Sequence, residues 1–269
     1  MAALRLLLGS VPAAGAVSAC AARLGLNPSV EDRAVLEDRR RREELVQEYV
    51  RGGGLALYRA ECHGREASRR CVAARAAIEA RTQELMHPPG VTAHSLRHYH
   101  LRHGCTRCTR QAVEAAAAAS RGRPVVEVGA GRGHWAKALS DAGLEVSAFD
   151  DGSAVPGGGA DPLFPVRRGG GSEALRDSRA TLLLVFPPPT PMAREALDAF
   201  AGSLVLYAGE PRGGANADDG FFDKLEAHYF VRDVVALDPF PGGVERLYVL
   251  EKRPWWWRRG VIRRKTSPV

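Results

Sequence analysis

The chain has 269 residues, of which 45% are hydrophobic, a normal share for a globular core of one large domain or two small ones. The net charge of +7 favours polyanionic partners such as nucleic acid or an anionic membrane surface, although an Arg-biased solvated surface gives the same count. No run reaches the ~18 apolar residues that cross a bilayer, so no transmembrane segment is expected. The five cysteines are odd in number and irregularly spaced, which excludes the pattern of a secreted disulfide framework and favours a reducing compartment.

The N-terminal segment, residues 1–26, contains Arg5, Arg23 and several Ser and Ala, and the first acidic residue is Glu31. This composition is typical of an organelle targeting segment, and it predicts a mitochondrial location, with plastid or cytoplasm as alternatives. A secretory signal peptide and an ordinary N-terminal helix are the competing interpretations of the same residues.

Residues 27–119 form an Arg-rich region with helical patterning. Asn27 and Pro28 suit the start of a helix over 27–50, which we expect Gly52 to Gly54 to end. A second helical stretch is predicted over 55–86 and a third over 92–120, separated by His87-Pro88-Pro89-Gly90.

A cluster of possible metal ligands lies in the third stretch. Cys105 and Cys108 have the C-x-x-C spacing of a zinc pair, and four histidines precede them. No second C-x-x-C pair exists, so we expect no metal and interpret the stretch as an exposed polar helix with incidental cysteines.

After Pro124 the pattern changes to short apolar runs that alternate with helix-length segments, which is typical of βαβ units. The last two runs are separated by a Pro- and Gly-rich turn, so they predict an antiparallel hairpin at the edge of a mostly parallel sheet. The predicted strands are Val125 to Val128, Leu144 to Phe149, Thr181 to Phe186, Ser203 to Ala208, Phe230 to Leu237 and Arg246 to Lys252, and the predicted helices are His134 to Ala142, Met192 to Phe200 and Phe221 to His228.

The most informative stretch joins the first of these strands to the following helix. Gly129, Gly131 and Gly133, with Ala130 between the first two, allow a tight turn and the close approach of a ligand to the backbone. The helix start that follows offers free N–H groups to an anion, which would be a pyrophosphate in a dinucleotide or a carboxylate in S-adenosylmethionine.

Two acidic residues flank the glycine loop. Glu127 lies two residues before Gly129 and would hold the loop or the amino group of the ligand. Asp150 ends the second predicted strand, where a carboxylate can accept hydrogen bonds from the ribose hydroxyls of an adenosine. The spacing is G-x-G-x-G rather than the dinucleotide pattern G-x-G-x-x-G, which would place His134 at the third glycine.

With Glu127, the loop resembles the first motif of class I S-adenosylmethionine-dependent methyltransferases, E-x-G-x-G-x-G. The stretch 124–252 is also similar to an uncharacterised methyltransferase-like family, through a strand that ends in aromatic-Pro-Pro, a strand that ends in Gly-Glu, and a helix that starts at Ala217-Asp218-Asp219. The chain departs from that family at His134, where an aromatic residue is expected. The resemblance implies an α/β fold, a doubly wound and mostly parallel seven-stranded sheet with a terminal antiparallel hairpin, over residues 120–253, with the helical region as an N-terminal extension.

Phe186, Pro187 and Pro188 end a predicted strand at the place of the Asp/Asn-Pro-Pro-aromatic motif of amino-methyltransferases. In that motif a polar side chain and prolyl carbonyls hold the target amine, whereas Phe186 cannot accept a hydrogen bond but could face a sulfonium cation. A rigid loop start is the alternative interpretation. Glu210 follows the next strand and is a candidate base, or else it caps the following segment.

The tail, residues 254–269, combines Trp255 to Trp257 with basic residues; from Lys252 onward there are seven Lys or Arg and no acid. Such a tail could bind nucleic acid, lie at a membrane interface, dock on a protein partner, or pack back on the domain.

These observations predict an S-adenosylmethionine-binding methyltransferase that modifies RNA or protein. Glu127, Gly129, Ala130, Gly131, Gly133 and Asp150 would bind the cofactor, and Phe186, Pro187, Pro188 and Glu210 would lie at the reacting centre. The alternative is a catalytically inactive methyltransferase-like subunit of an organellar ribonucleoprotein or other large assembly, which the Arg-rich region and the Trp/Arg tail would attach to RNA or to protein partners.

Overall fold

The structure is a computed structural model that describes residues 25–64, 66–153 and 161–254. At its centre lies a seven-stranded sheet in the order β3-β2-β1-β4-β5-β7-β6. Strands β1 to β5 run parallel to one another, and β7 is antiparallel to both β5 and β6. The strands are β1 (Val125–Val128), β2 (Val146–Asp150), β3 (Val166–Arg168), β4 (Thr181–Val185), β5 (Leu204–Gly209), β6 (Tyr229–Ala236) and β7 (Arg246–Lys252).

The central strands are apolar because helices cover both faces of the sheet. Every residue of β1 and β5 is buried, and so are the first four residues of β4. On one face α6 (Arg110–Ser120) and α7 (His134–Asp141) pack against side chains such as Leu183 and Leu206. On the other face α8 (Met192–Ala199) and α9 (Asp219–His228) pack against neighbours in the same strands, such as Leu182 and Val205. Successive strand residues therefore serve opposite layers, as a doubly wound sheet requires.

The predicted fold class is confirmed, including the terminal hairpin, and the predicted strands and helices from β1 onward lie within two residues of the observed ones. The sequence does not predict the position of the seventh strand, β3. It is three residues long and lies in the Gly-rich stretch, so it carries no periodicity to detect.

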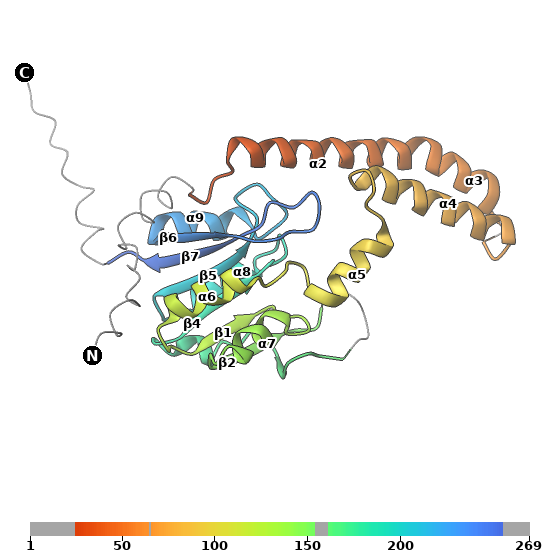
Figure 1. Cartoon of the computed structure of the whole chain (residues 1–269). Helices are drawn as coiled ribbons and strands as arrows, with labels where there is room; N and C mark the ends of the chain where they lie inside the picture. The colour runs from red at the N-terminus through yellow and green to blue at the C-terminus, as the bar shows by residue number, and fades with distance from the viewer. Residues whose placement is uncertain (1–24, 65, 154–160, 255–269) are drawn as a thin grey trace, which may run out of the picture.

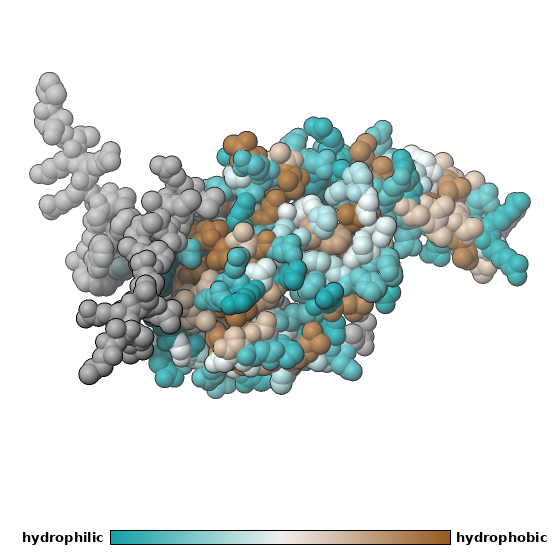
Figure 2. Space-filling view, in the orientation of Figure 1, coloured by the Kyte–Doolittle hydropathy of each residue, from teal (hydrophilic) through white to brown (hydrophobic). Residues whose placement is uncertain are grey.

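The N-terminal helices form an arm that extends away from the sheet (Figure 1). The arm, as we use the term, comprises α2 (Val30–Tyr49), a π-helical segment (Val50–Gly54), α3 (Leu55–Cys62) and α4 (Arg69–Met86), and α5 (Ala93–His103) leads from it to the domain. Figure 2 shows hydrophobic residues interspersed with hydrophilic ones along the arm. None of the helices in the described ranges is long and apolar enough to cross a bilayer.

The glycine run in the arm does not end a helix as predicted. Val50–Gly54 continues as a π-helical segment directly into α3. Gly54 is buried, and a Cβ atom there would lie 3.3 Å from the Tyr49 carbonyl and 3.6 Å from Ile78 Cγ2. The missing side chain thus allows α4 to pack closely, so the glycine serves helix packing rather than termination.

The predicted single stretch over 55–86 is two helices, α3 and α4, which pack against each other as a hairpin. Ser68 caps α4 by accepting a hydrogen bond from the Cys71 amide at 3.1 Å. A buried disulfide joins Cys62 to Cys71 across the turn, which corrects the expectation that the cysteines stay reduced. The irregular spacing of the cysteines does not predict this disulfide, because a single bond between two nearby cysteines requires no regular cysteine pattern.

The predicted boundary at residue 119 also falls inside the sheet domain. Ala112 and Ala116 of α6 are fully buried against Leu139 and Leu204, so α6 is one of the helices that cover the sheet.

Leu26, at the end of the predicted targeting segment, is buried in the core, and its carbonyl accepts a 2.8 Å hydrogen bond from the Arg212 amide. The rest of that segment, residues 1–24, and the Trp/Arg tail from residue 255 lie outside the described residues.

Candidate functional site

The glycine loop follows β1 at the carboxyl edge of the sheet, next to the point where the chain order reverses between β1 and β4. Gly129, Gly131 and Gly133 all have positive φ, at 75°, 54° and 79°. This conformation costs other residues free energy, so the loop needs glycine for its backbone shape alone. The three glycines nevertheless differ in what surrounds them.

A Cβ atom on Gly131 would meet nothing within 4 Å, whereas one on Gly133 would lie 2.7 Å from the Phe164 Cβ. Gly131 therefore faces open space, and Gly133 makes room for the chain that leads into β3. Of the predicted cofactor-binding glycines, Gly131 is therefore free for a ligand to approach, whereas Gly133 allows the loop to pack. On Gly129 a Cβ atom would lie 2.9 Å from the flexible Met192 methyl group.

A cavity of about 440 Å³ lies over the carboxyl ends of β1, β2 and β4. This volume is within the range of small-molecule sites. Of the ten residues that the sequence predicts for the site, eight line this cavity: Glu127, Gly129, Ala130, Gly131, Asp150, Phe186, Pro187 and Pro188. The two that do not are Gly133 and Glu210.

Asp150 ends β2 and lies beneath the glycine loop. Its Oδ2 accepts a 2.8 Å hydrogen bond from the Gly131 amide, and its Oδ1 accepts one of 2.7 Å from the Gly152 amide. Each carboxylate oxygen can accept more than one hydrogen bond, so both can still receive a ligand hydroxyl. The side chain is half-buried at the cavity wall, as the prediction of a ribose-binding role requires.

Glu127 is the most unusual group in the cavity. It is 1% exposed, and its Oε2 has no hydrogen-bond partner among the described residues. Burial, aided by the nearby Asp150, raises the pKa of this carboxyl from 4.5 to about 8, although the Ala136 amide donates a hydrogen bond that opposes the shift. A buried carboxylate oxygen without a partner costs free energy, and a bound cation would supply the missing partner.

The turn after β4 is strained. Phe186 has a φ of 47°, which costs a non-glycine residue of order 1–3 kcal/mol, and such strain persists only where surrounding contacts enforce it. Its amide donates a 2.7 Å hydrogen bond to the Ala208 carbonyl of β5. The Pro187 carbonyl accepts from the Ala217 amide at 3.0 Å and from Asn216 Nδ2 at 3.3 Å. The prolyl carbonyl that would hold an amine in amino-methyltransferases is therefore already occupied by two donors.

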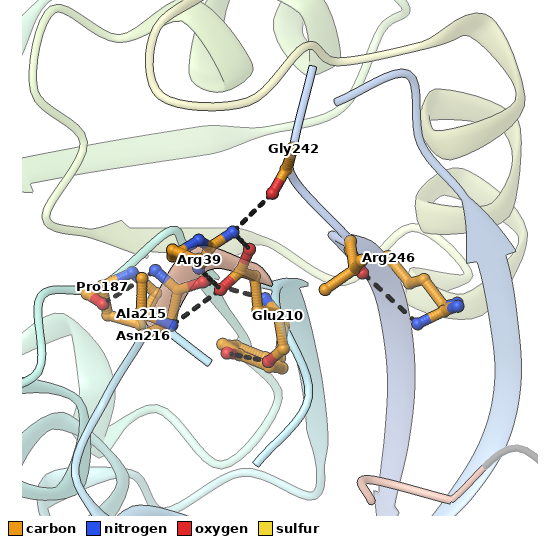
Figure 3. A network of polar contacts seen from close by, with 9 residues as sticks. Arg39, Pro187, Glu210, Ala215, Asn216, Gly242 and Arg246 are labelled. Atoms are coloured by element: carbon orange, nitrogen blue, oxygen red, sulfur yellow. Dashed lines mark hydrogen bonds and ion pairs between the residues drawn. The ribbon is translucent and has the colours of Figure 1, made fainter. Parts of the chain in front are cut away.

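Glu210, the candidate base, points away from the cavity. Its carboxylate is 1% exposed and receives both terminal nitrogens of Arg39, at 2.6 Å and 2.7 Å (Figure 3). Its Oε2 also accepts a 2.7 Å hydrogen bond from the Ala215 amide. The structure thus places Glu210 in a buried ion pair with the arm, where its oxygens are used by the protein itself.

The structure adds a wall that the sequence did not predict, formed where α5 meets α6 by His103, Gly104 and Cys105. Trp135 fixes this linker by donating a 2.9 Å hydrogen bond from its indole to the Thr106 carbonyl. His134 approaches the Leu101 carbonyl at 3.2 Å, so the departure from the family pattern at this position coincides with a contact to α5. Burial lowers the pKa of His134, which keeps its ring neutral near pH 7.

Other lining residues missed from the sequence come from the glycine loop, from the segments that follow β2 and β3, and from the start of α8; they are Arg132, Asp151, Ser153, Gly169, Gly170, Thr190, Met192 and Glu195. Most belong to stretches without a recognisable motif, and their proximity depends on the sheet order. Besides Glu127, which its pKa of about 8 keeps mostly protonated at neutral pH, three acidic side chains line the cavity, Asp150, Asp151 and Glu195, against one arginine, Arg132. The cavity therefore favours a ligand that carries positive charge.

The two cysteines with the spacing of a zinc pair, Cys105 and Cys108, are half-buried. Burial raises the pKa of Cys105 to about 11 and that of Cys108 to about 12, so both thiols are protonated at neutral pH. Within the described ranges no group of three or more His, Cys, Asp or Glu side chains could hold a metal ion.

No protein-family model and no curated protein matches the chain. Among solved structures it is similar to the tRNA (uracil-54, C5)-methyltransferase of Pyrococcus abyssi in complex with S-adenosyl-L-homocysteine, at 15% identity and a TM-score of 0.35, over 53% of this chain and 37% of that one. It is also similar to magnesium protoporphyrin IX methyltransferase from Synechocystis with bound SAM, at 13% identity and a TM-score of 0.39, over 79% and 97% of the two chains. The mitomycin 7-O-methyltransferase aligns at 15% identity and a TM-score of 0.35, over 85% and 74% of the two chains.

The fold is established by the chain's own sheet. Five parallel strands carry an inserted antiparallel β7, and a glycine loop follows β1 at the point where the strand order reverses. This is the arrangement that the resemblance of the glycine loop to the first methyltransferase motif implied, and the chain accordingly has the class I, Rossmann-like methyltransferase fold.

Proposed function

We propose that the cavity binds S-adenosylmethionine and that the protein transfers its methyl group to a nucleic-acid acceptor. The observation that carries the proposal is the buried Glu127 carboxyl, whose Oε2 has no partner in the described part of the chain, beside a glycine loop with open space at Gly131. An ammonium group would satisfy Glu127, and the ligand's main chain could approach Gly131 without obstruction. These features support an amino-acid moiety at this end of the cavity.

The other end of the cavity suits the nucleoside. Asp150 retains acceptor capacity at both oxygens, which supports hydrogen bonds from two ribose hydroxyls. The lining has three further acidic side chains besides Glu127 and one arginine, and this excess of carboxylates favours a ligand with ammonium and sulfonium charges. A dinucleotide carries two phosphates instead, and these would be repelled by the same carboxylates.

The sulfonium supplies an activated methyl group, so transfer needs chiefly that donor and acceptor be held in line. Phe186 lines the cavity and can present its ring to a cation, an interaction of about 0.5–2 kcal/mol. Because the Pro187 carbonyl is already bonded to Asn216 and Ala217, recognition of an amine by this carbonyl finds no support. With Glu210 in an ion pair, a proton released by the acceptor would pass to solvent or to another lining group.

The nucleic-acid acceptor is supported by charge at the cavity rim. Helix α5 carries Arg97, Arg102 and four histidines but no acidic residue, and it ends at the cavity wall. Both arginines are exposed, and neither forms an ion pair with another described residue. A phosphate backbone lying along α5 would be held electrostatically next to the cavity mouth. Binding through the Trp/Arg tail and a mitochondrial location remain predictions from the sequence.

Calorimetric titration with S-adenosylmethionine, with NAD as the control ligand, tests the proposal. We expect S-adenosylmethionine to bind and NAD not to bind. Binding of S-adenosylmethionine should be lost in Asp150→Ala and retained in Asp177→Ala, which removes a partly exposed carboxylate that bonds to Arg179, away from the cavity. Transfer of a radiolabelled methyl group to total RNA, with total protein as the second acceptor pool, then identifies the substrate class. If neither S-adenosylmethionine nor NAD binds at ~1 mM, the proposal is refuted.

One observation favours the alternative of a catalytically inactive subunit. Phe186 replaces the polar residue that amino-methyltransferases use, and its backbone conformation is strained. Binding of S-adenosylmethionine without methylation of RNA or protein would support that alternative, with the cavity then serving as a structural ligand site.

A further inference from the structure

Helix α2 of the arm docks on the sheet domain through two ion pairs. Asp32 accepts both terminal nitrogens of Arg246 on β7, at 2.7 Å and 2.9 Å. Arg39, two turns further along α2, reaches Glu210 after β5. Both pairs involve a carboxylate that is almost fully buried, at 4% and 1% exposure. They differ in what lies beyond the carboxylate.

Beyond Asp32, Arg246 also bonds to the Val244 carbonyl and to the Tyr248 side chain, and neither of these two residues lines the cavity. The Arg39 pair continues toward the cavity. Arg39 also donates a 2.7 Å hydrogen bond to the Gly242 carbonyl, so its guanidinium is held from two sides (Figure 3). The hydrogen bond to Glu210 raises the pKa of Arg39, so the guanidinium stays charged.

Beyond Glu210 the contacts run through a short loop. The Glu210 carboxylate accepts from the Ala215 amide at 2.7 Å, and the Glu210 amide donates to Asn216 Oδ1 at 2.8 Å. Asn216 is 2% exposed, and its Nδ2 donates to the carbonyl of Pro187, which lines the cavity. The path from Arg39 to the cavity wall therefore consists of consecutive hydrogen bonds that pass through the buried residues Glu210, Asn216 and Pro187 (Figure 3).

Both backbones that meet at the Pro187 carbonyl are strained. Phe186 and Ala217 have φ values of 47° and 53°, in the left-handed region that non-glycine residues avoid. The Ala217 amide donates directly to the Pro187 carbonyl at 3.0 Å, so each strained turn holds the other. A pair of strained turns persists only when neighbouring contacts enforce it, and Glu210 provides such contacts through Ala215 and Asn216.

We propose that Arg39 is a positioning residue for the cavity: by fixing Glu210 it holds the loop 210–217, and through Asn216 it holds the Phe186-Pro187 turn in its strained form. The inference rests on the proposed function in that the cavity is taken as the ligand site. The arm is thereby joined to the wall of the site, and loosening of α2 at Arg39 changes the cavity.

The test compares Arg39→Met with Asp32→Asn in the full chain. Both remove one of the two ion pairs that dock α2, but only the first interrupts the path to Pro187. Because Arg39→Met leaves the buried Glu210 charge without a partner, a double variant with Glu210→Gln is included to preserve folding. Arg39→Lys is the conservative variant, since Lys keeps the charge and one contact to Glu210.

Two measurements report on the wall without any ligand. Hydrogen exchange follows the amides of Ala215 and Ala217, and ¹³C-methyl NMR follows Met192, whose methyl group lies next to Gly129 in the cavity. We expect Arg39→Met and the double variant to exchange at these amides about tenfold faster or more and to shift the Met192 resonance. Asp32→Asn should leave both unchanged, and Arg39→Lys should recover most of the protection.

Unchanged amide exchange and an unchanged Met192 resonance in Arg39→Met would overturn the inference. It would also be overturned if Asp32→Asn changed both measurements as much as Arg39→Met does, or if Arg39→Lys did not recover the protection from exchange. Titration with S-adenosylhomocysteine then adds the link to the ligand, with a loss of affinity of about fivefold or more expected for Arg39→Met only. If the wild-type chain does not bind this ligand, the proposed function fails while the exchange and NMR results still decide the positioning role.

Discussion

The Asp150 carboxylate accepts a 2.8 Å hydrogen bond from the Gly131 amide, which joins the end of β2 to the middle of the glycine loop. The two strands that carry them, β1 and β2, are parallel neighbours, so their carboxyl ends necessarily lie together. A residue predicted to bind the ligand therefore also shapes the loop that binds it. Substitutions at Asp150 should affect both stability and affinity.

Replacement of Asp150 by Asn is expected to disrupt the loop. The Gly131 and Gly152 amides both donate to this side chain, and an amide has only one oxygen to accept them, so its NH₂ group would face a donor. We expect a loss of about 1–3 kcal/mol in the free energy of unfolding, together with at least a tenfold loss of affinity for S-adenosylmethionine. Urea unfolding and calorimetry measure the two effects, and wild-type values for Asp150→Asn would contradict the prediction.

Gly131→Ala separates backbone strain from ligand approach, because the chain offers a matched control. Gly122, between α6 and β1, also has a positive φ, at 74°, and a Cβ atom at either glycine would meet nothing within 4 Å. Both substitutions should cost about 1 kcal/mol of stability. Only Gly131 faces the cavity, so S-adenosylmethionine binding should weaken in Gly131→Ala and stay at the wild-type level in Gly122→Ala. Equal affinities in calorimetry would remove Gly131 from the binding surface.

Glu127→Gln should change how stability depends on pH. Burial raises the pKa of Glu127 from 4.5 to about 8, so between these pH values the folded protein holds a proton that the unfolded chain lacks. The free energy of unfolding therefore falls as the pH rises through this window, by up to about 1.4 kcal/mol per pH unit. The Gln variant lacks this dependence, so it should be the more stable protein above pH 8 and should no longer bind S-adenosylmethionine.

Urea unfolding at several pH values between 5 and 9 checks this expectation. Glu245→Gln is the control, because burial raises the pKa of Glu245 to about 7 and this carboxyl lies outside the proposed ligand site. It should flatten the pH dependence only below about pH 7 and leave ligand affinity unchanged. A Glu127→Gln profile parallel to that of the wild type would show that Glu127 is ionised in the folded protein.

The sequence predicted the sheet far better than the arm, and the reason is physical. The continuous apolar run of β5 and the glycines after β1 are local signals of buried parallel strands and of a tight turn. The partners of Glu210 and Cys62 depend instead on which helices come together, and a single sequence does not encode this as a pattern. From its position at a strand end, the sequence therefore places the Glu210 carboxylate on the ligand side of the sheet, whereas in the structure it binds Arg39, which is 171 residues away.

The Cys62–Cys71 disulfide should stabilise the tip of the arm and leave the cavity unaffected. Closing a short loop of this kind contributes about 2–3 kcal/mol by restricting the unfolded chain. Reduction should speed hydrogen exchange in α3 and α4 without changing exchange at Ala217 or the affinity for S-adenosylmethionine. Tryptic digestion without reductant checks the bond directly, because cleavage at arginines between the cysteines leaves two linked peptides. Recovery of both peptides unlinked from oxidised protein would contradict the pairing.

Removal of charge from α5 should weaken the binding of single-stranded RNA in a salt-dependent manner. Arg97 and Arg102 are exposed beside the cavity rim, and each phosphate contact contributes about 0.7 to the slope of log affinity against log salt. The double variant Arg97→Ala/Arg102→Ala should therefore lower that slope by about 1.4 in fluorescence anisotropy titrations. The control, Arg121→Ala/Arg176→Ala, removes the same charge from two exposed positions that precede β1 and β4, at the opposite edge of the sheet. If both double variants lower the slope equally, the attraction arises from net charge alone, and α5 does not guide the acceptor to the cavity.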